Sequence, residues 1–457
     1  MTVNKPNNIY SKIKLLSHLK MMFAVAVLTF SSLVVKSQDQ SEKPDKHKNK
    51  PLIHYMNEDK THYIKFGGYG QFWTRYTDLN PGSKIDESIV KKTSDLSLRR
   101  FRMKMTIVPL DKFSIVLQGG TTNLSNLSNQ ESSFDLLDAY GEYQYKTYFS
   151  FGAGRSSWKG LTRFASGPSS TLLYDVPFLT LGNVNRTDLT LRNLNIYAKG
   201  QFSKLDYRLI IAKPYIASTA APGEQISVFN NLAVKPNYSG YVKWQFFEKE
   251  SNAGSTSSGS YLGKKKVLAL GFGAEYQKNV LWNLNNQDTV LNSLKLFSAD
   301  VFFDTPVNLN KGTSFNIYAA AFLHDYGPNY IRNLGINTMA NGSDNQTASF
   351  NGSGNAYPVV GTGKSFILQT GYTLPYFNQQ KKTTRLMPAV AFQYSDFDRL
   401  DQPMFTYDLG LTLLLKDHAS KLIFNAQSRP IYTNQNSDLK VSERKMMYVL
   451  MYHISID

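Results

Sequence analysis

The chain has 457 residues, with 51 lysines and arginines against 34 acids, and it therefore carries a formal charge of +17. It contains no cysteine, which excludes disulfides, zinc–thiolate centres and cysteine nucleophiles. Its 28 tyrosines, 28 phenylalanines and 4 tryptophans are many for a soluble protein, but they are ordinary for a membrane barrel with aromatic girdles.

The N-terminus has the pattern of a secretory signal. Lysines without any acid precede an apolar run over 21–35, which is too short for a membrane helix, and a small-residue cleavage site lies before Gln38. We predict a signal peptide over 1–37, although a buried helix would give a similar pattern. Its removal takes away five lysines, so the charge of the exported chain falls from +17 to +12. The polar stretch 38–61 is predicted as a periplasmic N-terminal segment.

Residues 62–457 are predicted to form one domain, an all-β transmembrane antiparallel barrel of about 16 strands. Most of the predicted strands alternate apolar and polar residues over ~9–13 positions, the length that a tilted strand needs to cross a bilayer. The predicted strands are 63–76, 95–107, 112–120, 135–146, 148–155, 188–199, 204–212, 239–248, 266–277, 294–304, 313–324, 363–374, 386–397, 405–416, 420–429 and 444–456.

The lengths of the connections support the barrel. Connections after even-numbered strands are mostly short, and those after odd-numbered strands are mostly long, as at Ser156–Thr187 and Pro430–Ser442. Short periplasmic turns and long outer loops are typical of outer-membrane barrels, and this parity places both termini in the periplasm. The Gly/Ser-rich stretch 249–265 is the exception, because it is long on the side where turns should be short.

Basic residues are predicted to line the lumen. Arg100, Arg102 and Lys104 alternate with Phe101 and Met103, so the three cations share one face of a strand. Three unpaired cations in a row would be costly in a sheet buried on both sides, whereas a wall with lipid outside and water inside accepts them. The same alternation predicts further inward cations at Lys65, Arg75, Arg208 and Lys243. They can concentrate anions, or they can merely be solvated or paired with inward acids.

The third outer loop, Ser156–Thr187, is rich in apolar residues. We predict that it folds into the lumen, where Lys159 and Arg163 line a constriction opposite the cations of the second strand. A cap on the outer rim or a contact between subunits would bury the same residues.

The chain ends in a strand with two different faces. Tyr448, Leu450, Tyr452, Ile454 and Ile456 share one face and are predicted to meet lipid, while the strand closes the cylinder against the first one. A core strand of a soluble β-sandwich is the alternative for this segment alone.

Three segments carry a family resemblance: F-G-G-Y-G-Q-F (66–72), L-S-L-R-R-F-R-M-K-M (96–105) and F-D-L-L-D-A-Y-G-E-Y (134–143). They resemble the phosphate-selective porin O and P family, in its Bacteroidetes-type variant. The resemblance implies a trimeric sixteen-stranded barrel with the third loop inside and a path for anions lined by arginine and lysine. By motif, Arg100, Arg102 and Lys104 carry over.

The predicted function is that of a porin of the bacterial outer membrane, a water-filled, anion-preferring channel for passive diffusion of small solutes that include phosphate. We expect no cofactor and no metal. The expected partners are membrane lipid, lipopolysaccharide, small anionic solutes and two further copies of the chain; export excludes nucleic acid. A pore-less structural or adhesin barrel is the alternative. A barrel-embedded enzyme is a weaker one, because no G-x-S-x-G or H-E-x-x-H motif occurs.

Overall fold

The computed structural model describes residues 52–127, 133–163, 167–182, 191–232 and 235–456. The predicted signal peptide therefore lies outside the described residues. The described part from residue 52 onward forms one compact unit. Among the described residues, no helix is both long enough and apolar enough to span a membrane.

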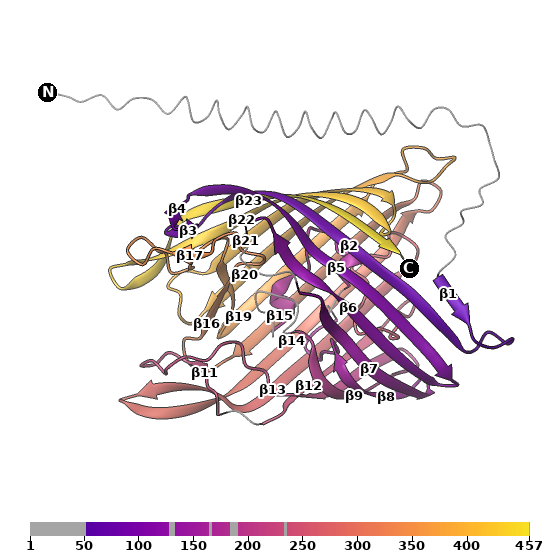
Figure 1. Cartoon of the computed structure of the whole chain (residues 1–457), viewed down its shortest axis with the longest axis horizontal. Helices are drawn as coiled ribbons and strands as arrows, with labels where there is room; N and C mark the ends of the chain where they lie inside the picture. The colour runs from indigo at the N-terminus through magenta and orange to yellow at the C-terminus, as the bar shows by residue number, and fades with distance from the viewer. Residues whose placement is uncertain (1–51, 128–132, 164–166, 183–190, 233–234, 457) are drawn as a thin grey trace. The chain divides into compact units, whose positions relative to one another are not determined.

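Sixteen of the described strands form a closed antiparallel barrel (Figure 1), which confirms the predicted fold. Neighbours in sequence pair with one another, and the last strand pairs with the first over Gly68–Thr77, opposite Ile456–Met447. The barrel strands are β2 (Tyr63–Asp78), β5 (Lys92–Leu110), β6 (Phe113–Ser125), β7 (Asp135–Lys146), β8 (Phe149–Ser156), β9 (Asn193–Phe202), β10 (Leu205–Ala212), β12 (Asn237–Gln245), β13 (Val267–Asn285), β14 (Asp288–Asn308), β15 (Thr313–Asp325), β19 (Gly363–Thr373), β20 (Arg385–Phe397), β21 (Met404–Lys416), β22 (Ser420–Gln435) and β23 (Asp438–Ile456).

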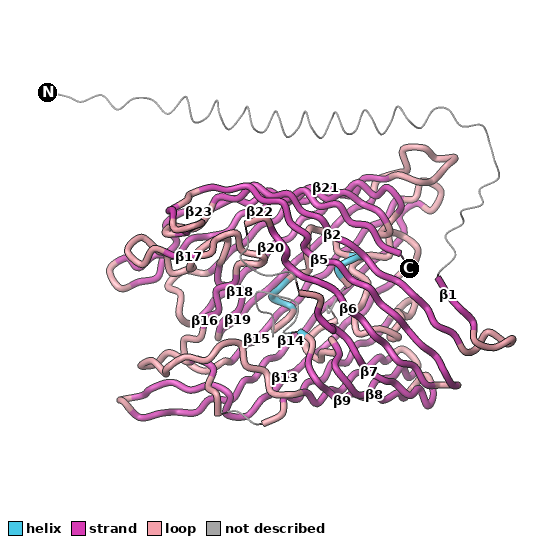
Figure 2. The backbone as a smooth tube through the Cα atoms, viewed as in Figure 1, coloured by secondary structure: helices cyan, strands magenta, loops and turns pink. Residues whose placement is uncertain are grey.

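The remaining elements are short and do not belong to the sixteen barrel strands. They are β1 (Leu52–Tyr55), β3 (Ser83–Ile85), β4 (Ser88–Ile89), β11 (Val228–Phe229), β16 (Ile331–Leu334), β17 (Gly342–Ser343), β18 (Tyr357–Gly361) and two 3-10 turns, η1 (Pro168–Ser170) and η2 (Phe178–Thr180). Helical structure is confined to short turns of this kind in the part of the chain that the structure describes, and Figure 2 shows them in cyan among the strands.

The outer face of the barrel is apolar. On β5, Phe101 and Met103 are exposed, whereas Arg100 and Arg102 between them are buried inside. On β23, Tyr452, Ile454 and Ile456 are exposed, while Val449 and His453 face the interior. A closed cylinder with such a belt, an even number of strands and mostly short turns on the side of its termini is a bacterial outer-membrane barrel, since only closed barrels pair every strand edge in lipid.

Three predicted boundaries were wrong. Pro430–Ser442 is not a loop, because β22 and β23 continue as a paired ribbon up to a two-residue turn at Asn436 and Ser437. Likewise, β13 and β14 extend past a bulge near Leu281 to a turn at 286–287. At the other end, part of the stretch 38–61 joins the wall, since β1 pairs with β2 (Leu52 opposite Phe66).

Two connections fill the lumen. Loop 3 (residues 157–192) enters from the outer side: its described residues, 157–163 and 167–182, pack in clusters inside the barrel, which excludes the alternative of a cap on the rim. The inner segment, residues 246–266, links β12 to β13 and enters from the periplasmic side. Loop 3 contributes to each of the hydrophobic clusters within the barrel, for example Leu172 and Leu173 beside Trp73 and Met451.

Loop 3 can lie against the wall because glycines leave room for it. A Cβ atom on Gly273 of β13 would stand 1.9 Å from the carbonyl oxygen of Leu161. On the opposite side, a Cβ on Gly410 of β21 would stand 2.5 Å from Leu173. Loop 3 therefore crosses the lumen from β13 to β21.

Candidate pore and its constriction

The arginines of β5 hold loop 3 in place. Arg100 donates to Asp175 Oδ1 of loop 3 at 2.7 Å and to Gln71 Oε1 of β2 at 2.9 Å. Its neighbour Arg99 donates to Asp175 Oδ2 at 2.9 Å and to Asn123 Oδ1 at 2.7 Å. Asp175 is almost fully buried, so its charge is compensated by two guanidinium groups rather than by water.

Sequence alternation missed Arg99. It puts Arg99 on the lipid face, because Arg100 faces inward and successive side chains point to opposite sides. The register between β2 and β5 shifts here, with Gln71 opposite Arg100 and Phe72 opposite Leu98. Arg99 is the extra residue of this bulge, and both arginines consequently point inward.

Arg102 and Lys104 line a cavity beside loop 3, together with Lys65 of β2. The cavity has a volume of about 260 Å³ and lies between the wall of β2, β5, β6 and β7, loop 3 near Gly167, and the inner segment near Gly254. Arg102 donates to the Thr121 carbonyl at 2.5 Å and to Thr122 Oγ1 at 2.6 Å.

The charge of this cavity is predominantly positive. Among the described residues that line it, Lys65, Arg102, Lys104 and Arg192 are basic, and Asp138 is the one acid. Asp138 lies 3.3 Å from Arg192, measured from Oδ1 to Nε, so part of the positive charge is compensated there. The described lining thus carries more basic than acidic side chains.

Arg75 does not share this cavity. It forms a buried ion pair with Asp95 (Nη2 to Oδ2 2.5 Å) and donates to the carbonyl oxygen of Asn337 in the long outer loop 326–362 at 2.8 Å. It therefore anchors an outer loop against the wall.

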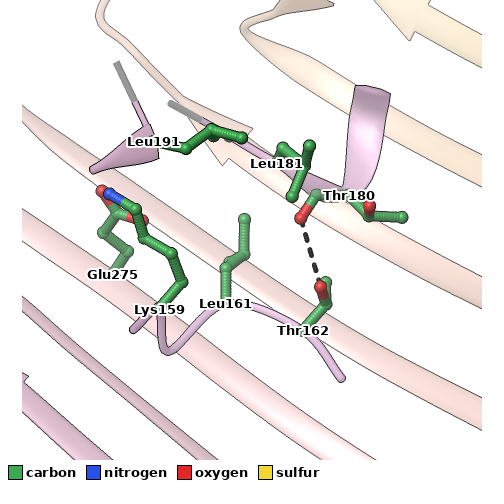
Figure 3. Close-up of a pocket in the computed structure, with 8 residues that line it drawn as sticks. Lys159, Leu161, Thr162, Thr180, Leu181, Leu191 and Glu275 are labelled. Atoms are coloured by element: carbon green, nitrogen blue, oxygen red, sulfur yellow. Dashed lines mark hydrogen bonds between the residues drawn. The ribbon is translucent and has the colours of Figure 1, made fainter. Parts of the chain in front are cut away.

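Lys159 and Arg163 of loop 3 lie on the other side of the lumen from the β5 cations. The Lys159 side chain points toward the Glu275 carboxylate of β13, beside Leu161 and Thr162 (Figure 3). Thr162 donates to the Thr180 carbonyl at 3.1 Å, which ties the two ends of this part of loop 3 together (Figure 3). The structure does not bring Lys159 toward Arg100.

Arg163 joins loop 3 to the inner segment. Its Nε donates to Glu250 Oε2 at 3.0 Å, and its guanidinium also reaches the Ser258 carbonyl at 2.8 Å. Its backbone N–H donates to Asp300 of β14 at 3.0 Å, and its guanidinium carbon stands 3.4 Å from the centre of the Phe302 ring.

Lys243 and Arg208 meet the same inner segment. Lys243 Nζ lies 3.0 Å from Glu250 Oε2, and Arg208 Nη1 donates to the Ser255 carbonyl at 3.3 Å. Lys199 of β9, which sequence reasoning did not single out, donates to the Asn252 carbonyl at 2.6 Å and pairs with Glu142 at 2.9 Å. The one sequence signal for Lys199 was the alternation of inward and outward residues along β9.

The arrangement places charged side chains around a small cavity inside the barrel. Among the described residues, no group of three histidine, cysteine or acidic side chains could hold a metal ion. The cavity is lined by charged and hydroxyl-bearing side chains together with glycines, Val116, Gln118 and Pro168. The charged and hydroxyl-bearing side chains can attract, orient and desolvate a small ion.

No family model and no curated protein matches the chain. Solved structures do. OprB of Pseudomonas putida is similar at 10% identity, over 86% of this chain and 94% of that one, with a TM-score of 0.50. The anion-selective porin from Comamonas acidovorans is similar at 10% identity over 86% and 99% of the two chains, with a TM-score of 0.47. The outer membrane channel DcaP of Acinetobacter baumannii is similar at 10% identity over 88% and 99%, with a TM-score of 0.48. At these identities the likeness concerns the fold alone.

Proposed function

We propose that the mature chain is an outer-membrane porin that prefers small anions, and that phosphate is among them. The observation that carries the proposal is the cavity between β5 and loop 3, with four basic side chains and one acid on its described walls. A net positive lining in a low-dielectric wall raises the local concentration of anions and lowers that of cations. The inner segment and loop 3 set the width of the path.

The inward cations have different roles in this proposal. Lys104 and Lys65 line the cavity and act on the passing solute. Arg100 acts mainly on loop 3, because Asp175 and Gln71 already occupy its guanidinium. The same supporting role falls to Arg75, Arg163, Arg208 and Lys243, which hold loops and segments in place. We therefore propose an anion path only for the cations that line the cavity, and not for every inward cation.

The test is the reversal potential of single channels, measured with a salt gradient across a planar bilayer. We expect anion preference in the native protein and a weaker preference in a double variant, Lys65→Gln with Lys104→Gln. Lys381→Gln with Lys382→Gln is the matched control, since both lysines are exposed in the turn between β19 and β20. The preference should fall as salt rises, because screening shortens to ~3 Å at 1 M.

Two outcomes would contradict the proposal. Cation preference in the native protein, or a preference that the double variant leaves unchanged, would remove the cavity as the selectivity element. Absence of any conductance would favour the pore-less structural barrel, for which the filling of the lumen by two connections is the specific observation. An enzyme is not proposed.

Export and assembly complete the proposal. The signal over 1–37 would be cleaved before Gln38, which N-terminal sequencing of the mature protein tests. The mature barrel would contact lipid and lipopolysaccharide and would assemble as a homotrimer. Crosslinking in detergent, followed by electrophoresis without boiling, tests the trimer.

A further inference from the structure

The inner segment spans the lumen at its periplasmic end. It starts at β12, yet Lys264 pairs with Asp417 of the turn between β21 and β22 (Nζ to Oδ2 2.8 Å). The carbonyl oxygen of Ser260 lies 3.0 Å from Nε2 of His418 in the same turn. A connection between two adjacent strands needs only a few residues, so its length is explained by this crossing and not by the need to join β12 to β13.

The segment presents acceptors to a basic cluster. We define the basic cluster as Lys199, Arg208, Lys243 and Arg163, all of which are nearly fully buried. The acceptors are the Glu250 carboxylate, for Lys243 and Arg163, and the carbonyl oxygens of Asn252, Ser255 and Ser258. The Glu250 carboxylate and these carbonyl oxygens thus contact the basic side chains in the way that the oxygens of a bound anion would.

We infer that the inner segment is a displaceable plug. Its tip, residues 252–258, covers Lys199 and Arg208 of the basic cluster and uncovers them for passing anions when it moves toward the periplasm, while Glu250 stays on Lys243 and Arg163. The inference deepens the proposed porin function and rests on it. It assigns Lys199 and Arg208 as a second anion site in series with the cavity at β5, open only while the tip is displaced.

The composition of the tip suits such movement. The sequence N-A-G-S-T-S-S has no large apolar side chain, so little buried apolar area opposes its release. A Cβ atom on Gly254 would meet nothing within 4 Å, because this part of the tip borders the cavity. The ends of the segment are held more firmly, by Glu250 on one side and by the buried Leu262 on the other.

A reversible lock tests the movement. Ser157 Oγ of loop 3 and Ser255 Oγ of the tip are 2.7 Å apart, and the chain has no cysteine of its own. A double variant, Ser157→Cys with Ser255→Cys, should form a disulfide that fixes the tip to loop 3. The two single-cysteine variants are controls for effects of the substitutions and of the oxidant.

We expect the oxidised double variant to conduct several-fold less than the same sample after reduction, while the single variants do not respond. A second variant, with residues 252–258 deleted, should conduct several-fold more than the native protein and show stronger anion preference, because Lys199 and Arg208 are then uncovered. Altered migration of unboiled samples in detergent gels verifies that each variant is folded.

The outcomes separate the inference from the function on which it rests. Equal conductance before and after reduction would show that the tip does not move, and would overturn the plug. Unchanged conductance after the deletion would show that the tip does not cover the path, with the same consequence. Absence of conductance in the native protein and in the deletion variant alike would instead overturn the porin function.

Discussion

Arg163 and Glu250 meet inside the barrel with Nε and Oε2 3.0 Å apart, although one belongs to an outer loop and the other to a periplasmic connection. Both are nearly fully buried. Two segments that enter from opposite sides of the membrane are thus joined inside the barrel by an ion pair, in addition to hydrogen bonds such as that between Ser157 and Ser255. This contact makes the width of the pore depend on both connections together.

Replacing Glu250 with Gln should loosen this junction. The substitution leaves Arg163 and Lys243 without their common carboxylate, and breaking a buried pair in this way typically costs ~3–5 kcal/mol. We expect higher and noisier single-channel conductance with an intact barrel. Glu443→Gln is the control, because Glu443 pairs with Lys445 at a partly exposed site in β23. Equal conductance in both variants would contradict a structural role of the Arg163–Glu250 pair.

The same carboxylate predicts a pH response. Burial alone would raise the pKa of Glu250, but the charges of Arg163 and Lys243 hold this pKa well below the ordinary value of 4.5. A carboxylate with a lowered pKa keeps its stabilising contribution above its unfolded pKa and loses it only as the pH falls through the lower folded value. The difference in conductance between the native protein and Glu250→Gln should therefore persist from neutral pH to about 3, where a glutamate of ordinary pKa is already mostly protonated. A difference that is half lost at about pH 4.5 and gone at about pH 3 would mean that Glu250 titrates normally.

Lipid and lumen faces of one strand should respond oppositely to charge. Met103 is 57% exposed on the lipid face of β5, and Lys104 beside it lines the cavity. Met103→Arg should cost ~2–4 kcal/mol near the bilayer midplane, because lipid does not solvate the guanidinium. Lys104→Glu should leave the barrel folded. Urea titration in lipid vesicles measures both, and equal stabilities would reverse the assignment of faces.

The docking of loop 3 against β13 depends on Gly273, because this residue has no side chain. Gly273→Val would bring a side chain against the Leu161 carbonyl, where a Cβ atom alone would be 1.9 Å away. Backbone lies on both sides of this contact, so loop 3 must shift. We expect a lower temperature for loss of the folded band in detergent gels. Ala274→Val is the matched control, since Ala274 is exposed on the lipid face of the same strand; an equal effect of both would indicate strand propensity rather than loop docking.

The strands of the barrel were predicted better from the sequence than the loops inside the lumen, for a physical reason. Each strand touches lipid on one side only, so a period of two is imposed on the chain wherever it crosses the membrane. Phe101 and Met103 against Arg102 and Lys104 follow this period and were placed correctly. The bulge at Arg99 breaks it without any local signal, since the extra residue is an ordinary charged one.

Loops inside the lumen obey no such period. The apolar residues of loop 3 predicted its burial, because water cannot accommodate so many of them, but not its partners. Lys159 was expected opposite Arg100 and lies near Glu275 instead. The inner segment is Gly/Ser-rich and reads as a flexible linker. Its path across the lumen is set by the contact of Glu250 with Arg163 of loop 3 and of Lys264 with Asp417 in the turn between β21 and β22, which no local pattern contains.

Two glycines of the inner segment allow a final test of its tip. A Cβ atom on Gly254 would meet nothing within 4 Å, whereas a Cβ on Gly259 would stand 2.3 Å from the carbonyl oxygen of Ser170 in loop 3. Gly259→Ala should therefore push the tip away from loop 3 and raise the conductance, while Gly254→Ala should leave it unchanged. Both substitutions add one methyl group and have the same small effect on the flexibility of the unfolded chain, so the difference between them isolates the contact with Ser170. Planar-bilayer recordings of the two variants at low salt provide the measurement. Equal conductance of the two would mean that the tip does not rest on loop 3 in the membrane.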